Sequence, residues 1–454
     1  MTSARGRPEL PLSDARGKSS LWVGALPALG LACALALMTL AAVIPAVTDW
    51  NVFTYLPPLR AGWRPRIGPG TFAALAIALL GFTWATRTAA SIRWSALLVG
   101  TWAVSVAWVV SLGSVDGLDS FSHFMSRSAQ YLDTGRAPTD VSVVIQEYIS
   151  RIPLRADNHF PVHLSGHPPG VFVFYAFLAQ LGVGAPVAAG LVTTLIATTT
   201  PAAVLVTLRV LGAEVMARKA APFLVLCPAA IWWPMLADGL FAAAAAWGLA
   251  ALAQAACRRS IGWSLTAGAL LGYCVMLSYG LVLLGFLALG VLIAARSTFP
   301  LLWAVAAAMA VVIVFAVEGF AWWEAYPVLR ERYWDGVARL RPTSYWLWAD
   351  LAALGFSAGP IMFAGVAQTL GRSRTYLAER ATRAVVVLVA AAVTTVAIAD
   401  LSLMSKAEVE RIWLPFMPWL LIGCALLPPR WARFGLAVQL GTALLISNLV
   451  SIPH

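Results

Sequence analysis

The sequence predicts an all-α, polytopic bundle of transmembrane helices, and both its composition and its apolar runs support this prediction. Of the 454 residues, 60% are hydrophobic and only 11% are charged, whereas a soluble domain carries roughly 25% charged residues. A chain with so few charges cannot cover a surface that faces water, so the solvent around its helices is lipid. Apolar runs recur to the end of the chain, and each run of about 20 residues is long enough to cross a bilayer core.

These runs predict about thirteen spans in one domain, 21–454, after a disordered basic leader at 1–20. The stretch 170–182 is apolar but short, so we expect a re-entrant or juxtamembrane helix there and not a crossing. The expected spans lie near 22–47, 70–87, 95–113, 186–211, 220–236, 238–257, 262–278, 281–296, 300–321, 345–370, 383–401, 412–428 and 433–450.

The positions of basic residues predict an orientation. Arginine and lysine cluster in the leader and at alternate span ends, as is typical of cytoplasmic loops. This pattern puts the longest loop, 114–169, outside, together with 322–344 and 402–411, and the last two carry cations against the usual bias. The net charge of +11 therefore indicates orientation and not a nucleic-acid partner. All five cysteines fall in apolar runs, so neither disulfides nor a zinc motif is expected.

The outer loop 114–169 holds the first candidates for chemistry. Asp116 and Asp119 follow a span directly, and a carboxylate beside the low-dielectric region can serve as a general base. The alternative for each is a helix N-cap, because a helical stretch is expected from Ser120 to Leu132.

Four of the five histidines lie in the same loop, and the last three are spaced by four residues. If that segment were helical, the three would share a face and could bind zinc. Prolines within and after the segment disfavour a regular helix, so we expect histidines that hydrogen-bond or contact substrate, with a divalent metal as the alternative. The four are His123, His159, His163 and His167.

Later segments add polar side chains on the same predicted face. Asp238 lies between two apolar runs, where an acid is costly and usually faces a cavity, although an exposed turn is the alternative. The loop 322–344 mixes arginines with aromatic residues of the kind expected at a membrane interface. Arginine and lysine bind phosphate, and the candidate cations are Arg330, Arg332, Lys406 and Arg411.

Taken in order, these elements resemble the GT-C glycosyltransferases, which are polytopic and use lipid-phosphate sugars; the nearest types are protein mannosyltransferases and aminoarabinose transferases. Asp119 resembles that family's acid in the first large outer loop, with Asp116 as the competing choice. His167-Pro168-Pro169 resembles the Lys/His-Pro-Pro motif. The remaining matches are Phe121, Phe124 and Arg127 after the acid, Asp238-Gly239-Leu240-Phe241, Gly268, Gly272 and Ser278-Tyr279-Gly280, and Ser405-Lys406 with Arg411-Ile412-Trp413-Leu414-Pro415.

The resemblance covers roughly 95–428 and departs from the family at 278–280, where the family's lysine is absent. It implies an inverting transfer of a sugar from a polyprenyl-phosphate donor to a glycan, lipid or protein acceptor. It also implies a bacterial cell-membrane protein whose active site faces outside. The implied roles are a catalytic base at Asp119 or Asp116, donor-phosphate binding by Arg330, Arg332, Lys406 and Arg411, and substrate contacts by His163, His167, Asp238, Arg127 and Tyr279.

Three rival functions remain open from the sequence. A transporter or flippase for a lipid-linked sugar would normally show internal repeats, and none is visible here. A structural scaffold gives no reason for so many histidines and acids in one loop. A zinc-dependent membrane hydrolase would need ligands beyond the loosely spaced histidines. No cofactor is assigned, and a divalent metal remains possible.

Overall fold

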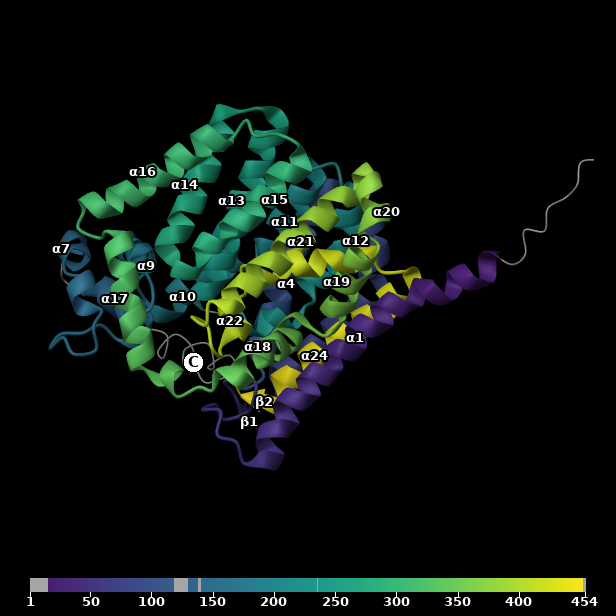
Figure 1. Ribbon diagram of the computed structural model, residues 1–454, viewed down its shortest axis with the longest axis horizontal. Helices are drawn as coiled ribbons and strands as arrows, with labels where there is room; N and C mark the ends of the chain where they lie inside the picture. The colour runs from purple at the N-terminus through teal and green to yellow at the C-terminus, as the bar shows by residue number, and fades with distance from the viewer. Residues whose placement is uncertain (1–14, 118–129, 138–139, 235, 452–454) are drawn as a thin grey trace, which may run out of the picture.

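The computed structural model describes residues 15–117, 130–137, 140–234 and 236–451. These residues form an all-α fold apart from one short antiparallel ribbon of β1 (Gly62–Trp63) and β2 (Val450–Ser451). The ribbon is extended by N–H groups of Arg64 and Arg66, which donate to the carbonyls of Leu449 and Asn448. It thereby ties the loop after the first helix to the end of the last one (Figure 1).

Among the described residues, seven helices are long and apolar enough to cross a membrane, so the protein is an integral, multi-pass membrane protein. Two of them consist of two consecutive helices; one is α2 (Pro69–Leu80) with α3 (Thr86–Ser91), which η1 (Gly81–Ala85) joins. The other candidate spans are α1 (Ala15–Thr48), α4 (Trp94–Gly113), α10 (Pro186–Ala197) with α11 (Thr200–Val210), α13 (Ala237–Arg258), α21 (Arg380–Leu401) and α24 (Pro429–Leu449).

Two bent helix pairs raise the number of candidate spans to nine if each pair is one span. The helix α16 (Leu301–Val317) turns by 72° into α17 (Trp322–Asp335), and α18 (Thr343–Ala358) turns by 107° into α19 (Ile361–Gly371). Because Gly359 adopts φ +88° and is followed by a proline, the helix cannot continue there. The segment 345–370, predicted as a span, is therefore a bent helix pair and not one straight helix.

The described helices do not establish the predicted total of about thirteen spans, because several apolar helices are short. For example, α14 (Ile261–Leu277) has 17 residues and is therefore about 26 Å long, short of a core of about 30 Å. The predicted span 220–236 is likewise not one straight helix, since α12 (Glu214–Val225) ends before Pro228 and η3 (Pro228–Trp232) follows. The remaining short apolar helices are α9 (Gly170–Gln180), η4 (Tyr279–Leu283) with α15 (Leu284–Ala295), and α23 (Met417–Leu421) with η6 (Ile422–Leu426).

The long polar segments are built from short helices. Within 114–169 the described part holds α6 (Gln130–Arg136), α7 (Val141–Gln146), η2 (Ile149–Arg151) and α8 (Val162–Ser165). Further short helices are η5 (Val337–Arg339), α20 (Ser373–Ala378) and α22 (Val409–Ile412). The predicted disordered leader lies mostly outside the described residues, but its last part, from Ala15 onward, belongs to α1.

Glycines bring two helices close together and so position the ends of both. A Cβ at Gly268 of α14 would lie 2.1 Å from the carbonyl oxygen of Ala304 in α16, and one at Gly272 would lie 2.7 Å from Ala308 Cα. In lipid, small residues allow such close backbone approach. At the ends of these helices the rings of Tyr279 and Trp322 come within 5.7 Å of each other, centroid to centroid.

Candidate functional site

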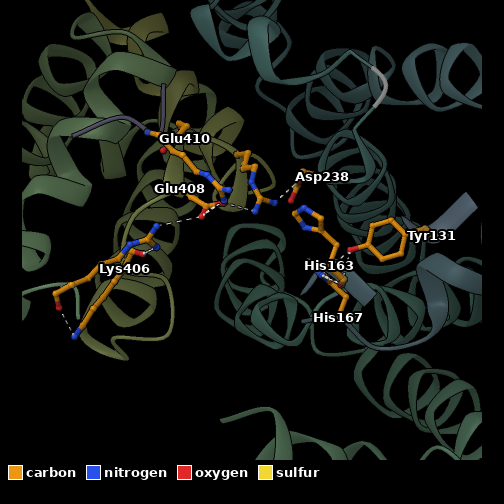
Figure 2. A network of polar contacts seen from close by, with 10 residues as sticks. Tyr131, His163, His167, Asp238, Lys406, Glu408 and Glu410 are labelled. Atoms are coloured by element: carbon orange, nitrogen blue, oxygen red, sulfur yellow. Dashed lines mark hydrogen bonds and ion pairs between the residues drawn. The ribbon is translucent and has the colours of Figure 1, made fainter. Parts of the chain in front are cut away.

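A cavity of about 450 Å³ opens where the polar segments meet, between the start of α13, η4, α17 and the segment 399–416. Figure 1 shows α18 and α22 close together beside this region. Six residues singled out from the sequence line the cavity: His163, His167, Asp238, Tyr279, Lys406 and Arg411. Residues more than 240 positions apart along the chain are thus brought to one site, with Lys406 at one end and the histidines at the other (Figure 2).

Arg411 joins the two sides of the cavity. Its Nη1 lies 3.3 Å from Asp238 Oδ2, and its Nη2 donates to Glu408 Oε2 at 2.6 Å. Asp238 begins α13 and Glu408 precedes α22, so this guanidinium connects two distant elements. Burial alone would lower the pKa of Arg411, but the two carboxylates raise it above its usual value, so it stays charged.

Glu408 is the carboxylate at the centre of the cations. Its Oε1 accepts from Arg60 Nη1 at 2.6 Å and lies 3.5 Å from Arg341 Nη2. Burial alone would raise the pKa of Glu408, but the guanidiniums of Arg411, Arg60 and Arg341 hold it below its usual range. The group is therefore an anion shared among three arginines.

An unusual backbone turn presents Lys406 and Glu408. Ala407 and Glu408 both have φ +64°, a left-handed conformation that costs roughly 1–2 kcal/mol for a residue with a side chain. Tertiary bonds hold the turn: the Ala407 N–H donates to Asp350 Oδ1 at 3.1 Å, and the Lys406 N–H donates to the Tyr333 hydroxyl at 3.0 Å. Strain held in this way is typical of functional sites.

Lys406 and Arg341 form a pair of adjacent cations. Arg341 Nη1 donates to the Lys406 carbonyl at 2.6 Å, and Lys406 Nζ donates to the Arg341 carbonyl at 3.2 Å. Lys406 Nζ also lies 4.7 Å from the centre of the Trp334 ring. No carboxylate among the described residues forms an ion pair with it, and burial lowers its pKa. This buried ammonium group is therefore poised to gain from a bound anion.

The histidine end of the cavity is built around Tyr131 of α6. The Tyr131 hydroxyl donates to the His163 carbonyl at 3.0 Å and lies 2.9 Å from His167 Nδ1. The same Nδ1 lies 3.0 Å from the His163 carbonyl oxygen. Burial lowers the pKa of His163 to about 4 and also lowers that of His167, so both rings are neutral near pH 7.

An aromatic wall closes one side of the cavity. The rings of Trp322 and Tyr326 stack at 5.4 Å with an interplanar angle of 1°, and Tyr279 packs against both. The Tyr279 hydroxyl and the indole N–H groups of Trp322 and Trp413 are buried without a hydrogen-bond partner among the described residues. The stacked rings of this wall therefore face the cavity with their apolar surfaces, while these polar atoms are enclosed by protein.

Arg330 and Arg332 lie in a different place from Lys406 and Arg411. They line a second groove of about 780 Å³ between α17 and the segment 153–155. Arg332 Nη2 donates to the Phe160 carbonyl at 3.2 Å. The four cations predicted to bind one phosphate are therefore divided between two cavities, which share the side chain of Tyr326.

Neither of the two predicted catalytic acids is seen in the cavity: Asp116 lies elsewhere, and Asp119 is outside the described residues. Asp116 Oδ2 lies 3.0 Å from Arg66 Nε and 3.6 Å from Arg64 Nη1, and Asp116 does not line either cavity. Asp119 and Arg127 lie outside the described residues, as do Phe121 and Phe124. Their predicted roles stay predictions.

The described histidines do not share a helical face. The helix α8 covers only Val162–Ser165, and the His159 side chain is exposed and bonds locally to the Ala156 carbonyl. Within residues 15–117, 130–137, 140–234 and 236–451, no cluster of three or more His, Cys, Asp or Glu side chains is placed to hold a metal ion.

Sequence reasoning missed Glu408, Arg341 and Tyr131 as parts of this site. For Glu408 a signal was present, because it lies in the charge-rich segment KAEVER just before an apolar run. Arg341 belongs to the predicted arginine cluster of the 322–344 loop but was not singled out. Tyr131 carries no local signal, since only the tertiary fold brings it to His167.

No protein-family model matches this chain, and no curated protein or solved structure is significantly similar to it. The fold and the cavity therefore define the class: an integral, multi-pass, all-α membrane protein with a buried charged cavity whose walls are partly apolar.

Proposed function

We propose that this protein is a membrane glycosyltransferase of the GT-C type that moves a sugar from a polyprenyl-phosphate donor to a glycan, lipid or protein acceptor on the outer face of the membrane. The observation that carries the proposal is the cavity itself. In one space it joins a buried lysine without a carboxylate partner among the described residues, a wall of stacked aromatic rings and a set of aliphatic side chains. These are the three chemistries of a phosphate, a sugar and an isoprenoid chain.

The charge balance of the lining supports a phosphate site. Arg341, Lys406 and Arg411 line the cavity together with Asp238 and Glu408. Three cations therefore face two carboxylates, which leaves one positive charge for an anionic ligand. Lys406 carries the available donors, since no carboxylate among the described residues forms an ion pair with it. Charge-assisted bonds from such groups are stronger than neutral ones.

The apolar part of the lining supports a lipid donor. Leu281, Val282 and Leu283 of η4 line the cavity together with Ile412 and Phe416. Val282 is 49% exposed on the protein surface, in an apolar helix of the membrane protein. The wall of the cavity thus reaches the surface that faces lipid, which gives an isoprenoid tail a route into the bilayer.

The proposed reaction is an inverting displacement at the anomeric carbon of the donor. The acceptor oxygen forms a bond to that carbon while the bond to the phosphate oxygen breaks, and the phosphate leaves with the electron pair. Cations placed at this developing charge stabilise the transition state, and Lys406 and Arg341 are in position to supply them. Asp119 stays the base predicted from the sequence.

Binding of decaprenyl phosphate to the purified protein in nanodiscs tests the phosphate site. We expect Lys406→Met to weaken binding by roughly tenfold to a hundredfold, the equivalent of one charge-assisted bond. Arg339→Gln is the matched control, because Arg339 is exposed and lines neither cavity. Unchanged affinity of the Lys406→Met protein would place the donor phosphate elsewhere.

Sugar transfer tests the activity directly. The wild-type protein is incubated with decaprenyl-phosphate-linked hexoses and pentoses and with membrane extract as the source of acceptor, and release of decaprenyl phosphate is measured. Movement of these donors between the leaflets of sealed vesicles without any cleavage would instead support the flippase alternative.

A further inference from the structure

The hydrogen bonds around His167 define which of its ring nitrogens carries the proton. Nδ1 lies 3.0 Å from the His163 carbonyl oxygen, which can only accept, and 2.9 Å from the Tyr131 hydroxyl. The hydroxyl itself lies 3.0 Å from the same carbonyl. Two protons satisfy this triangle if Nδ1–H and the Tyr131 O–H both donate to the carbonyl. An unprotonated Nδ1 would instead face the carbonyl lone pairs, which is repulsive.

The neutral ring therefore has its lone pair on Nε2, and this atom is open to the cavity. Nε2 has no hydrogen-bond partner among the described residues. It is also not among the unpaired polar atoms that the protein buries from solvent. His167 is half-buried and lines the cavity. An unpaired acceptor thus faces the space in which a substrate would lie.

We infer that His167 Nε2 accepts the proton of the acceptor hydroxyl and that Tyr131 is the residue that positions it. This inference rests on the proposed glycosyltransferase function and assigns the base to the histidine instead of Asp119. In the step, the acceptor O–H bond breaks as the oxygen bonds to the anomeric carbon. The hydroxyl proton goes to Nε2, and the electron pair of the breaking bond leaves on the phosphate.

The location of His167 in the cavity fits this role. In an inverting displacement the nucleophile and the leaving group lie on opposite sides of the reacting carbon. Lys406 lies at one end of the polar network and His167 at the other, with Glu408 and Asp238 between them (Figure 2). A base at the histidine end is therefore opposite the cations proposed for the phosphate.

The surroundings also stabilise the product of the proton transfer. Asp238 is the carboxylate that acts on the ring electrostatically and favours its protonated form. The other charged or titratable groups that face the ring are Arg411, His163 and Tyr131. Nδ1 stays bonded to the His163 carbonyl throughout, so the ring does not have to turn.

The ring is held rigidly from behind. Tyr131 is buried and stacks on Tyr175 at 6.3 Å with an interplanar angle of 10°, and the Tyr175 hydroxyl bonds to Thr193 at 3.2 Å. After His167 two prolines lead into α9, whose first residue, Gly170, packs against the Met276 carbonyl so closely that a Cβ would lie 2.5 Å from it. Preorganisation of this kind is what a positioned base requires.

The decisive experiment compares His167→Asn with wild type in the transfer assay. The asparagine amide can keep the bond to the His163 carbonyl but offers no base. We expect kcat to fall by roughly a hundredfold or more, while decaprenyl phosphate binds within about twofold of wild type. His159→Gln is the control, because that side chain is exposed and outside the cavity. A His167→Asn protein with wild-type kcat would overturn the inference.

Two further variants make the outcome specific. Tyr131→Phe should shift the acid limb of the pH profile of kcat, which the loss of a purely structural contact would not do. An acid limb that does not shift counts against the inference. This test remains available if the His167→Asn protein does not fold. Loss of kcat in an Asp119→Asn protein, together with an active His167→Asn protein, would return the base to Asp119. If the wild-type protein transfers no sugar from any donor, this result contradicts the proposed function itself and not only the assignment of the base.

Discussion

The pKa values of two glutamates in one short segment are shifted in opposite directions. Glu408 is held as an anion by three arginines, whereas burial raises the pKa of Glu410 to about 7. Glu410 accepts one bond, from the Arg60 N–H at 3.2 Å, and its Oε2 is buried without a partner among the described residues. The difference follows from the pairing: Glu408 forms ion pairs with three arginines, whereas Glu410 is buried without an ion pair among the described residues.

This contrast predicts how Glu410→Gln changes stability with pH. The raised pKa means that the folded protein binds a proton that the unfolded chain releases, so wild type loses stability as the pH rises from about 4.5 to about 7. Glutamine mimics the protonated form and escapes this loss. At pH 8 the variant should be more stable by up to about 3 kcal/mol, with no such advantage at pH 4.5.

Thermal unfolding in detergent at pH 4.5 and pH 8 measures this effect. Glu324→Gln serves as the control because Glu324 is exposed. A stability difference of the same size at both pH values would contradict the raised pKa of Glu410.

At the scale of elements, helix contacts through glycine position the aromatic wall. The helix α14 leads into η4 with Tyr279, and α16 turns into α17 with Trp322. Gly268 and Gly272 let the two helices approach until their backbones touch. The glycines that resemble a family motif thus act here through packing and place the aromatic residues that line the cavity.

Gly268→Ala should separate these helices, since its Cβ would lie 2.1 Å from the Ala304 carbonyl oxygen, which is backbone and cannot turn away. We expect a loss of about 1–3 kcal/mol in stability, measured as a lower unfolding temperature in detergent. Gly100→Ala in α4 is the matched control, because no atom lies within 4 Å of a Cβ there. Equal unfolding temperatures of the two variants would show that the contact is not tight.

At the scale of the whole molecule, the cavity and the groove define one side of the membrane. The segments 153–155 and 326–335 share the groove, and α17 also walls the cavity. The helix α21 has 22 residues, is a candidate span, and ends at the cavity with Ala399. The other end of α21, next to α20, must therefore lie on the opposite side of the bilayer.

Cysteine labelling tests this arrangement in a background in which the five native cysteines are replaced by alanine. Single cysteines at Asp157 and Glu331, both exposed, should react with a membrane-impermeant maleimide from the same side of sealed vesicles. A cysteine at Arg374, also exposed, should react only from the other side. Labelling of all three from one side would mean that α21 does not cross.

The predictions from sequence succeeded for properties that composition and short patterns determine. The all-α, multi-pass class was predicted correctly because few charges and long apolar runs suffice for it. Six residues singled out from the sequence, among them His167, Asp238 and Arg411, line one cavity, and their roles stay predictions. The total of about thirteen spans was not established. Neither 220–236 nor 345–370 is one straight helix, because hydropathy averages over breaks that Pro228 and Gly359 introduce.

The sequence by itself determined that lipid surrounds this protein, since the apolar content of a chain decides whether its surface is compatible with water or with lipid. Only the tertiary structure decided how the polar groups pair. It placed Arg330 and Arg332 in a groove apart from Lys406, put Glu408 among three arginines, and brought Tyr131 to His167. The physical reason is that hydropathy acts residue by residue, whereas hydrogen bonds and ion pairs depend on distances of a few ångströms between segments far apart in the chain.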